Sequence, residues 1–290
     1  MKNKDIFTFR DAEKQAGPVA FSTMLKPAGS ACNLDCHYCY YLDKAVQYGG
    51  KQAVMSDELL ELYVRQYIEA NDVDTVQFCW HGGEPLLLGV DFYRRAMDFQ
   101  QKYADGKRIE NTLQTNGTLV DEAWCDLFAG NNFLVGISLD GPQDIHDAFR
   151  LTKGGRPTFE RVMRTIGMFQ RSGVEYNTLS VVNRLCEGRG GEIYRFFRDT
   201  VHSRYMQFLP AVEHVVDKPG FHRPLIVSPE REGARLAEWS VTAEGYGQFL
   251  CDLFDEWVVS DVGRCYVQLF DATLAQWCGV QPGVCSMGET

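Results

Sequence analysis

Three cysteines lie close together near the start of the chain, in the stretch CNLDCHYC. A structural zinc site is completed by four ligands, usually two cysteine pairs, and Cys32, Cys36 and Cys39 have no second pair nearby. An iron–sulfur cluster held by three thiolates instead leaves one iron open to an exogenous ligand. The spacing therefore indicates a metal centre. It is either a zinc clip whose fourth ligand lies elsewhere or a cluster with an open iron.

Composition limits the classes of function. With 290 residues, of which 45% are hydrophobic, the chain can bury one large core, or a core with a small appendage. Its 29 basic and 39 acidic residues give a net charge of −10, which repels phosphate backbones and anionic lipid. We therefore expect neither nucleic acid nor membrane as a partner. The charged start MKNKDIFTFRDAEK and the lack of long apolar runs predict a cytoplasmic protein.

Apolar, β-rich runs alternate with segments of helical spacing. The helical segment at residues 56–70 has Ser56 as a cap, and the one at 158–173 begins with Thr158 and ends at Gly173. Such alternation predicts an α/β fold with a parallel sheet, either doubly wound or closed as a barrel. The predicted strands are residues 20–25, 75–80, 111–115, 133–139, 175–182 and 204–209.

The loops after these strands carry most of the polar motifs. Ligands of parallel α/β folds bind beyond the carboxyl ends of the strands, which is where HGGEP, NGT and DGPQDIHDAFR occur. Residues 213–238 lack a clear periodicity and are expected to form a long surface excursion. A helical part follows, before the pair Cys278 and Cys285 in CGVQPGVC.

Two of these motifs together resemble the radical S-adenosylmethionine enzymes. The stretch CNLDCHYC matches their C-x3-C-x2-C signature, with an aromatic residue before the last cysteine, and HGGEP matches their GGEP motif. The stretches LQTNGTLVDEAW, FLVGISLDGPQDIHDAFR and CGVQPGVC are similar to the anaerobic sulfatase-maturating enzymes of the SPASM group. This resemblance implies a six-stranded partial barrel at residues 20–240. An extension at 1–19 would precede it, and a helical linker with the start of a SPASM-type module would follow at 241–290.

The resemblance also implies roles for individual side chains. The cysteines Cys32, Cys36 and Cys39 would hold a 4Fe-4S cluster whose open iron binds S-adenosylmethionine. Asp140 would either hold a ribose hydroxyl or only cap its Asp-Gly turn, and both roles remain open. Tyr41 and Gln114 match positions that meet the substrate peptide. The remaining residues expected around the cofactor are Tyr38 near the adenine, Gly82 and Gly83 for close backbone approach, Glu84 for the methionine ammonium, Ser138 and Arg150 for polar groups, and Val212.

The implied reaction oxidises a sulfatase. A 5′-deoxyadenosyl radical would take hydrogen from the β-carbon of a Cys or Ser in an unfolded C-x-P-x-R or S-x-P-x-R segment, giving formylglycine. A flavodoxin or ferredoxin would donate the electron. Cys278 and Cys285 look like the first ligands of auxiliary 4Fe-4S clusters whose other ligands have no counterpart before Thr290. A truncated chain that cannot complete turnover is therefore expected.

Three other functions fit the same motifs. The barrel motifs agree equally with a SPASM-group enzyme that crosslinks small peptides, although QTNGT and CGVQPGVC favour sulfatase maturation. A zinc-clipped binding module would use the cysteines structurally. A non-catalytic scaffold would keep the barrel for interactions alone.

Overall fold

The structure is a computed structural model that describes residue 10 and residues 20–41, 54–217, 224–281 and 284. The predicted extension at residues 1–19 therefore lies almost wholly outside the described residues. No helix among the residues described is long and apolar enough to cross a bilayer.

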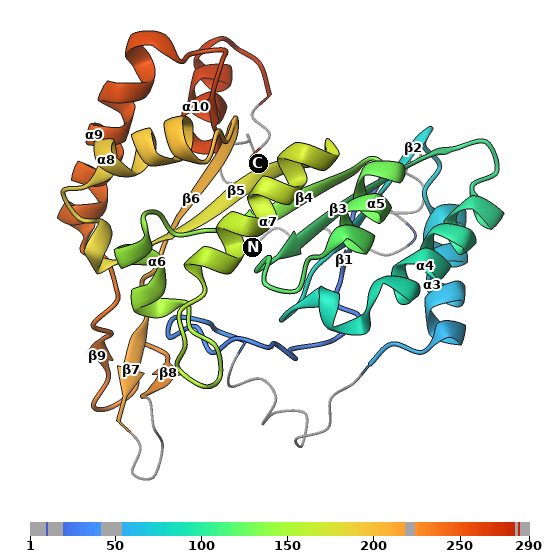
Figure 1. The fold of residues 1–290 in the computed structure, drawn as a ribbon, viewed down its shortest axis with the longest axis horizontal. Coiled ribbons are helices and arrows are strands. Elements are labelled where there is room, and N and C mark those ends of the chain that lie inside the picture. Colours follow the sequence, from blue (N-terminus) through green and yellow to red (C-terminus); the bar gives the residue numbers. More distant parts are fainter. Residues whose placement is uncertain (1–9, 11–19, 42–53, 218–223, 282–283, 285–290) are drawn as a thin grey trace, which may run out of the picture.

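Seven parallel strands form one open sheet (Figure 1). All six predicted strands are present, although the first is reduced to the two residues that pair with β2. The seventh, β10, lies in a region predicted to be only helical, and it pairs with β6. The sheet order is β1 (Met24–Leu25), β2 (Thr75–Trp80), β3 (Arg108–Thr115), β4 (Phe133–Ser138), β5 (Glu175–Val182), β6 (Tyr205–Pro210) and β10 (Tyr266–Val267).

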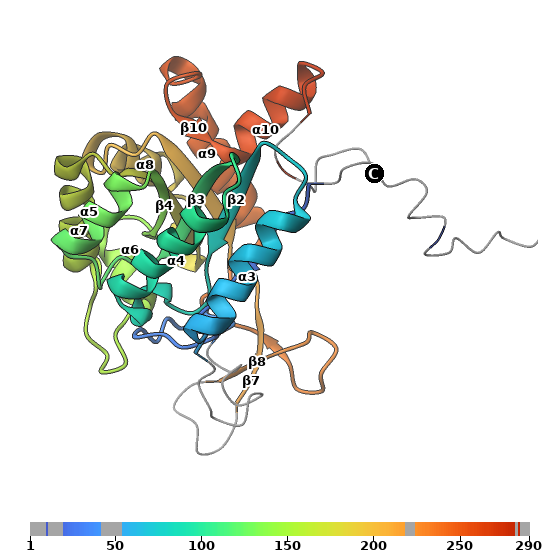
Figure 2. The same ribbon diagram turned by 90° about the vertical axis from the view of Figure 1, so that its right-hand side faces the viewer.

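Helices connect consecutive strands, and Figure 2 shows α3, α4, α5 and α7 along one side of the sheet. Apolar side chains such as Val64, Phe128 and Ile166 pack there with Phe78 and Val135 of the strands and form the main core. The helices are α3 (Asp57–Ala70), α4 (Val90–Tyr103), α5 (Glu122–Gly130), α6 (Gln143–Phe149), α7 (Phe159–Ser172), α8 (Gly190–Arg195), α9 (Ala243–Ser260) and α10 (Gln268–Trp277), with short turns η1 (Pro85–Leu88), η2 (Arg184–Cys186) and η3 (Phe196–Thr200).

Two of the three predicted helix ends are confirmed. The Ser56 side chain accepts a hydrogen bond from the N–H of the third residue of α3, and Gly173 ends α7 in the left-handed conformation with φ 69°. Thr158 precedes α7, but its hydroxyl makes no capping bond. The capping oxygen is Oδ1 of Asp147, which accepts from the N–H groups of Thr158 (2.8 Å) and of the next residue (2.9 Å).

Strand alternation gives the sheet one face packed on helices and one face with polar side chains. In β3, Leu113 and Thr115 are buried, whereas Gln114 between them is half-buried. Asn177 in β5 follows the same alternation, because successive side chains of a strand point to opposite faces. The face away from α3, α4, α5 and α7 is therefore the one available to a ligand.

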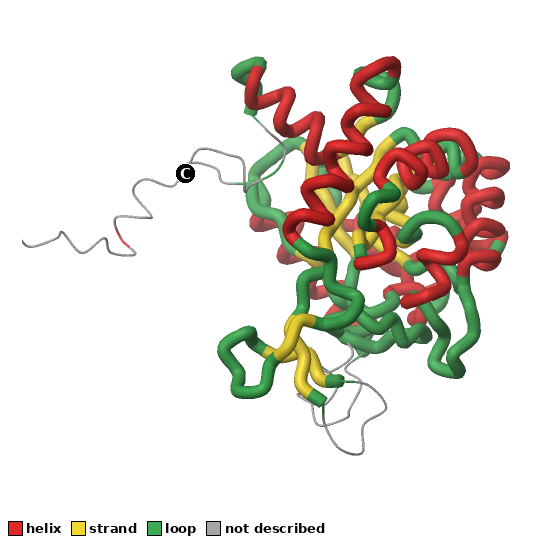
Figure 3. The backbone as a smooth tube through the Cα atoms, turned by 90° about the vertical axis from the view of Figure 1, so that its left-hand side faces the viewer, coloured by secondary structure: helices red, strands yellow, loops and turns green. Residues whose placement is uncertain are grey.

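The segment at residues 213–238 contains a small sheet, where the sequence predicted only an excursion. Strands β7 (His214–Val216), β8 (Leu225–Val227) and β9 (Arg235–Leu236) are antiparallel in the order β8–β7–β9. Figure 3 places this sheet at the opposite end of the molecule from α9 and α10. Val215 and Trp239 pack with Leu34, Cys36 and Tyr38 in a second apolar cluster. The small sheet thus supports the loop that carries the three cysteines.

A buried histidine joins the loop after β4 to the start of α7. His146 Nδ1 accepts from the backbone N–H of Asp140 (3.3 Å), and Nε2 lies 3.0 Å from Thr158 Oγ1. The Thr158 hydroxyl donates to the carbonyl of Arg150 (2.7 Å), so its oxygen can accept from Nε2–H. Both ring nitrogens of the neutral imidazole are therefore used, and burial lowers the pKa of His146 to about 4.

We expect His146→Asn to reveal this proton linkage. The unfolded histidine binds a proton near its ordinary pKa, so stability falls as pH drops from the unfolded value toward the folded one. The free energy of unfolding of the wild type relative to the variant should fall by about 2 kcal/mol between about pH 7 and about pH 5. Urea denaturation at both pH values measures this change. The same substitution at exposed His202 is the control, and a pH-independent difference for His146→Asn would contradict the linkage.

Candidate functional site

A cavity of about 300 Å³ opens at the carboxyl ends of the strands and gathers most of the residues predicted from the sequence. Each enters from a different loop or strand end, as expected for a parallel α/β sheet. The predicted residues that line it are Cys32, Cys36, Tyr38, Cys39, Tyr41, Gly82, Gly83, Gln114, Ser138 and Arg150.

The three cysteines lie on a loop that is fixed by backbone hydrogen bonds. The N–H of Asp35 donates to the carbonyl of Leu151 (2.8 Å), and within the loop the N–H of Cys39 donates to the carbonyl of Cys36 (2.9 Å). Burial raises the pKa of the Cys32 thiol to about 11 and that of Cys36 to about 12. Both thiols are thus protonated near neutral pH, and a metal that binds them must displace these protons.

Three thiols on the wall of one cavity suit an iron–sulfur cluster, because each thiolate then binds a different iron atom. A single zinc ion instead needs all its ligand atoms about 2.0–2.3 Å from one point. Among the described residues, no three His, Cys, Asp or Glu side chains are placed to hold a single metal ion.

The two glycines after β2 let their loop pack directly on the backbone that precedes the cysteines. The N–H of Gly83 donates to the carbonyl of Gly29 (3.0 Å), and the N–H of Glu84 donates to the carbonyl of Ala31 (2.7 Å). A Cβ on Gly83 would lie 2.2 Å from the Ala31 oxygen, and Gly82 has φ 127°. Close backbone approach was predicted here, and the structure shows that the cysteine loop is one partner of that approach.

Glu84 is fully buried, and its carboxylate binds neighbouring loops. Oε1 accepts from the N–H of Leu86 (3.0 Å) and from Thr115 Oγ1 (2.9 Å), while Oε2 accepts from the N–H of Asn116 (2.8 Å). Burial raises its pKa to about 7, although the three donors act in the opposite direction. Since a carboxylate has about four acceptor positions, one remains on Oε2. Its expected contact with a methionine ammonium stays a prediction.

Asp140 organises a buried charged network behind the cavity wall. Its Oδ1 accepts from Arg150 Nε (2.9 Å) and from the N–H of Val181 (3.1 Å), and its Oδ2 accepts from the Tyr38 hydroxyl. The Arg150 guanidinium also lies 5.5 Å from the centre of the Tyr38 ring. Burial raises the pKa of Tyr38 well above its ordinary value. Burial lowers that of Arg150, but the carboxylate more than offsets this, so the net shift is upward. Both Asp140 oxygens are therefore engaged within the protein.

Gln114 is held against the neighbouring strand. Its Nε2 donates to Ser138 Oγ (3.1 Å), and it lies opposite Gly136 in the β3–β4 register. A Cβ on Gly136 would lie 2.0 Å from Gln114 Oε1, so the glycine gives the amide its space. Tyr41 also lines the cavity, with the ammonium of Lys26 5.2 Å from the centre of its ring.

Three predicted residues are not at this cavity. Val212 is 56% exposed, and buried Ala211 lines the cavity instead, because neighbouring side chains after β6 point to opposite sides. The thiol of Cys278 is exposed after α10, and Cys285 lies outside the described residues. Sequence reasoning also missed Asn116, which lines the cavity. Its signal was the Asn-Gly pair directly after the third strand.

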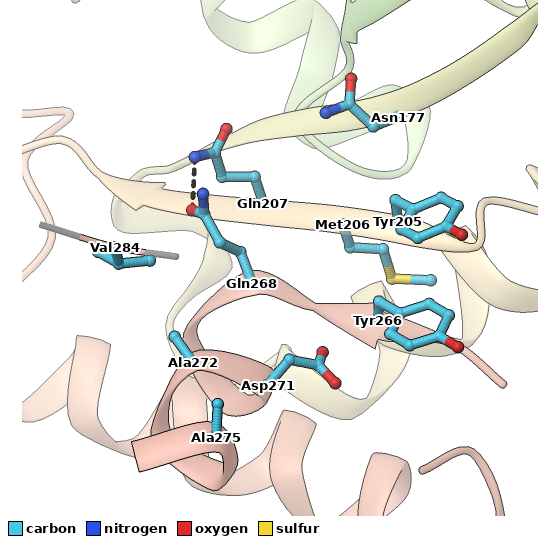
Figure 4. A pocket seen from close by; sticks show the side chains of 10 residues that line it. All are labelled: Asn177, Tyr205, Met206, Gln207, Tyr266, Gln268, Asp271, Ala272, Ala275 and Val284. Carbon is cyan, nitrogen blue, oxygen red and sulfur yellow. Dashed lines mark hydrogen bonds between the residues drawn. The ribbon is translucent and has the colours of Figure 1, made fainter. Parts of the chain in front are cut away.

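A second cavity, of about 410 Å³, lies lower on the same face of the sheet (Figure 4). The amides of Asn177, Gln207 and Gln268 line it, and Gln207 Nε2 donates to Gln268 Oε1. Asn177 comes two residues before Leu179 and Gln207 two before Leu209, and both leucines line the first cavity. Because side chains two apart on a strand share a face, the two cavities occupy one surface of the sheet.

Comparison with known proteins finds a family and several relatives. The model of the radical SAM superfamily matches residues 27–186. A serine-type anaerobic sulfatase-maturating enzyme of Bacteroides thetaiotaomicron is 47% identical over 92% of this chain and 64% of its own length. A cysteine-type enzyme of Clostridium novyi is 36% identical over 92% of this chain and 68% of its own length.

A solved structure gives the same relationship in three dimensions. Native anSMEcpe with bound AdoMet and Cp18Cys peptide matches with a TM-score of 0.77 at 31% identity, covering 91% of this chain and 67% of that one. This chain thus spans about two thirds of the length of these proteins.

We expect Gly83→Ala to destabilise the protein by about 1–3 kcal/mol, because the new methyl group meets a backbone oxygen that cannot move away. Gly247→Ala is the matched control, since this glycine lies within α9 with open space around it. That substitution should stabilise the protein by about 0.5–1 kcal/mol. Urea denaturation of both variants makes the comparison, and equal effects of the same sign would refute the close packing.

Proposed function

This chain belongs to the radical SAM superfamily and, within it, to the anaerobic sulfatase-maturating enzymes, and we propose from this membership that it converts a Cys or Ser of a sulfatase to formylglycine. One structural observation supports the proposal most directly. Cys32, Cys36 and Cys39 line a single cavity together with Arg150 and Ser138. The cavity therefore offers soft ligands for iron beside polar groups for a charged cofactor.

The residues around the cavity divide into two groups by their chemistry. Cys32, Cys36 and Cys39 would hold a 4Fe-4S cluster, which with S-adenosylmethionine supplies a 5′-deoxyadenosyl radical when bound. The guanidinium of Arg150 retains its charge beside Asp140 and suits a carboxylate of the cofactor. Tyr38 presents a ring beside this cation and would pack on the adenine.

The polar face of the sheet would receive the peptide. Gln114 and Tyr41 line the first cavity, and the amides of Asn177 and Gln207 continue along the same face into the second (Figure 4). Amide side chains both donate and accept, so they match the backbone groups of an extended polypeptide. The proposed substrate is an unfolded sulfatase segment of the C-x-P-x-R or S-x-P-x-R type.

The oxidation removes two electrons and two protons from the substrate side chain. One hydrogen atom leaves the β-carbon to the radical, and a second electron and proton must follow before the aldehyde forms. We propose auxiliary 4Fe-4S clusters as the electron acceptor, with Cys278 and Cys285 among their ligands. A flavodoxin or ferredoxin as donor and the division of the chain at residue 240 are proposals of the same kind.

Peptide oxidation tests the proposed function. The anaerobically purified, iron-loaded protein should convert a C-x-P-x-R or S-x-P-x-R peptide to an aldehyde that a hydrazine reagent traps and mass spectrometry detects. Cys36→Ala should abolish cleavage of S-adenosylmethionine, because it removes one of three anchors. Cofactor cleavage without aldehyde on either peptide would point to another peptide-modifying radical enzyme. A colourless, zinc-containing protein would refute radical chemistry altogether.

A further inference from the structure

The Asn-Gly-Thr turn after β3 folds back onto the first cysteine. Asn116 Nδ2 lies 3.8 Å from Cys32 Sγ and donates to Asn33 Oδ1 at 2.9 Å. The backbone N–H of Leu34 approaches the same sulfur at 3.4 Å. A second N–H group, carried by a side chain, is therefore aimed at a thiol that the proposed function assigns to iron.

Hydrogen bonds within the turn fix the orientation of this amide. The backbone N–H of Thr118 can only donate, and it lies 2.9 Å from Asn116 Oδ1. The Thr118 hydroxyl donates to the same oxygen (2.8 Å) and accepts from Asn33 Nδ2 (2.8 Å). Asn33 Oδ1 is left as an acceptor that faces Asn116 Nδ2. The amino group of Asn116 must therefore point to Asn33 and Cys32, with one hydrogen for each.

The backbone of Asn116 is fixed as firmly as its side chain. Its N–H donates to the buried carboxylate of Glu84 (2.8 Å), and the residue is only 7% exposed. Gly117, with φ 75°, makes the turn that brings Thr118 back to the amide. Such a preorganised donor needs no rearrangement to reach the sulfur.

We propose that Asn116 is a positioning residue that donates an N–H to the Cys32 sulfur when this thiolate holds the cluster, and so makes the cluster easier to reduce. Reduction adds one negative charge, which is shared with the thiolate sulfurs, and a hydrogen bond to a ligand sulfur stabilises the more negative state. This inference rests on the cluster of the proposed function. It does not depend on which peptide is oxidised.

Redox titration of Asn116 variants tests the inference. Asn116→Leu removes the donor with little change in size, and Asn116→Asp keeps the acceptor for Thr118 while replacing the donor with an oxygen. Thr118→Val is the matched control, because it opens the same hydrogen-bonded ring but leaves the backbone N–H that orients the amide. All are made in a Cys278→Ala/Cys285→Ala background, so that the signal followed comes from the cluster at Cys32.

The reduced cluster is followed by electron paramagnetic resonance at controlled potentials, with iron and sulfide content as a check on loading. At a fixed potential, the reduced-to-oxidised ratio should fall about tenfold in Asn116→Leu, which corresponds to 59 mV for one electron. The decrease should be larger in Asn116→Asp and less than twofold in Thr118→Val. An unchanged ratio in a fully loaded Asn116→Leu, or an equal decrease in Thr118→Val, would overturn the proposal.

A measurement on the wild type keeps the test decisive if the variants do not load iron. With ¹⁵N in the asparagine side-chain amides only, pulsed electron paramagnetic resonance of the reduced cluster should detect a hyperfine coupling to nitrogen. No coupling would overturn the proposal. Failure of peptide oxidation with a normal coupling would refute only the proposed reaction, so the two failures are distinguishable.

Discussion

The buried carboxylate of Glu84 is the constraint on which the geometry of the site depends. It accepts from Thr115 and Asn116 at the end of β3 and from the turn after its own strand, while its backbone N–H donates to the cysteine loop. Burying this group opposes its ionisation, as its pKa of about 7 shows, and the donors recover part of that cost. One side chain thus holds three loops in register. The position of Cys32 relative to Asn116 follows from it.

The other side of the cavity depends on a buried ion pair. Asp140 and Arg150 are both buried, and either charge alone would be costly in such surroundings. The Tyr38 hydroxyl and the N–H of Val181 satisfy the remaining acceptor positions of the carboxylate. Together these bonds fix the direction of the guanidinium and of the aromatic ring. A cofactor that enters the cavity therefore meets groups that are already oriented.

The sequence predicted the elements that carry a periodic pattern and missed those too short to have one. Strands β2–β6 are apolar runs bounded by turn residues, whereas β10 has two residues and β7 three, too few to show alternation. The cysteines and the glycines were found because their types and spacing are themselves informative. Partners distant in sequence were not, since nothing near Glu84 predicts a bond to residue 116. Val212 failed because the alternation of faces after β6 shows only in the folded chain.

The hydrogen bonds that shape the cavity all lie within the protein, which separates folding of the site from loading of the metal. Glu84 and Asp140 hold their loops through groups that remain in place whether or not iron is bound. The thiols of Cys32 and Cys36 are different, because burial raises their pKa and favours the protonated form. Iron must therefore displace protons from a preformed loop rather than order a disordered one. The proton released on loading is where the chemistry of the metal and the stability of the fold are coupled.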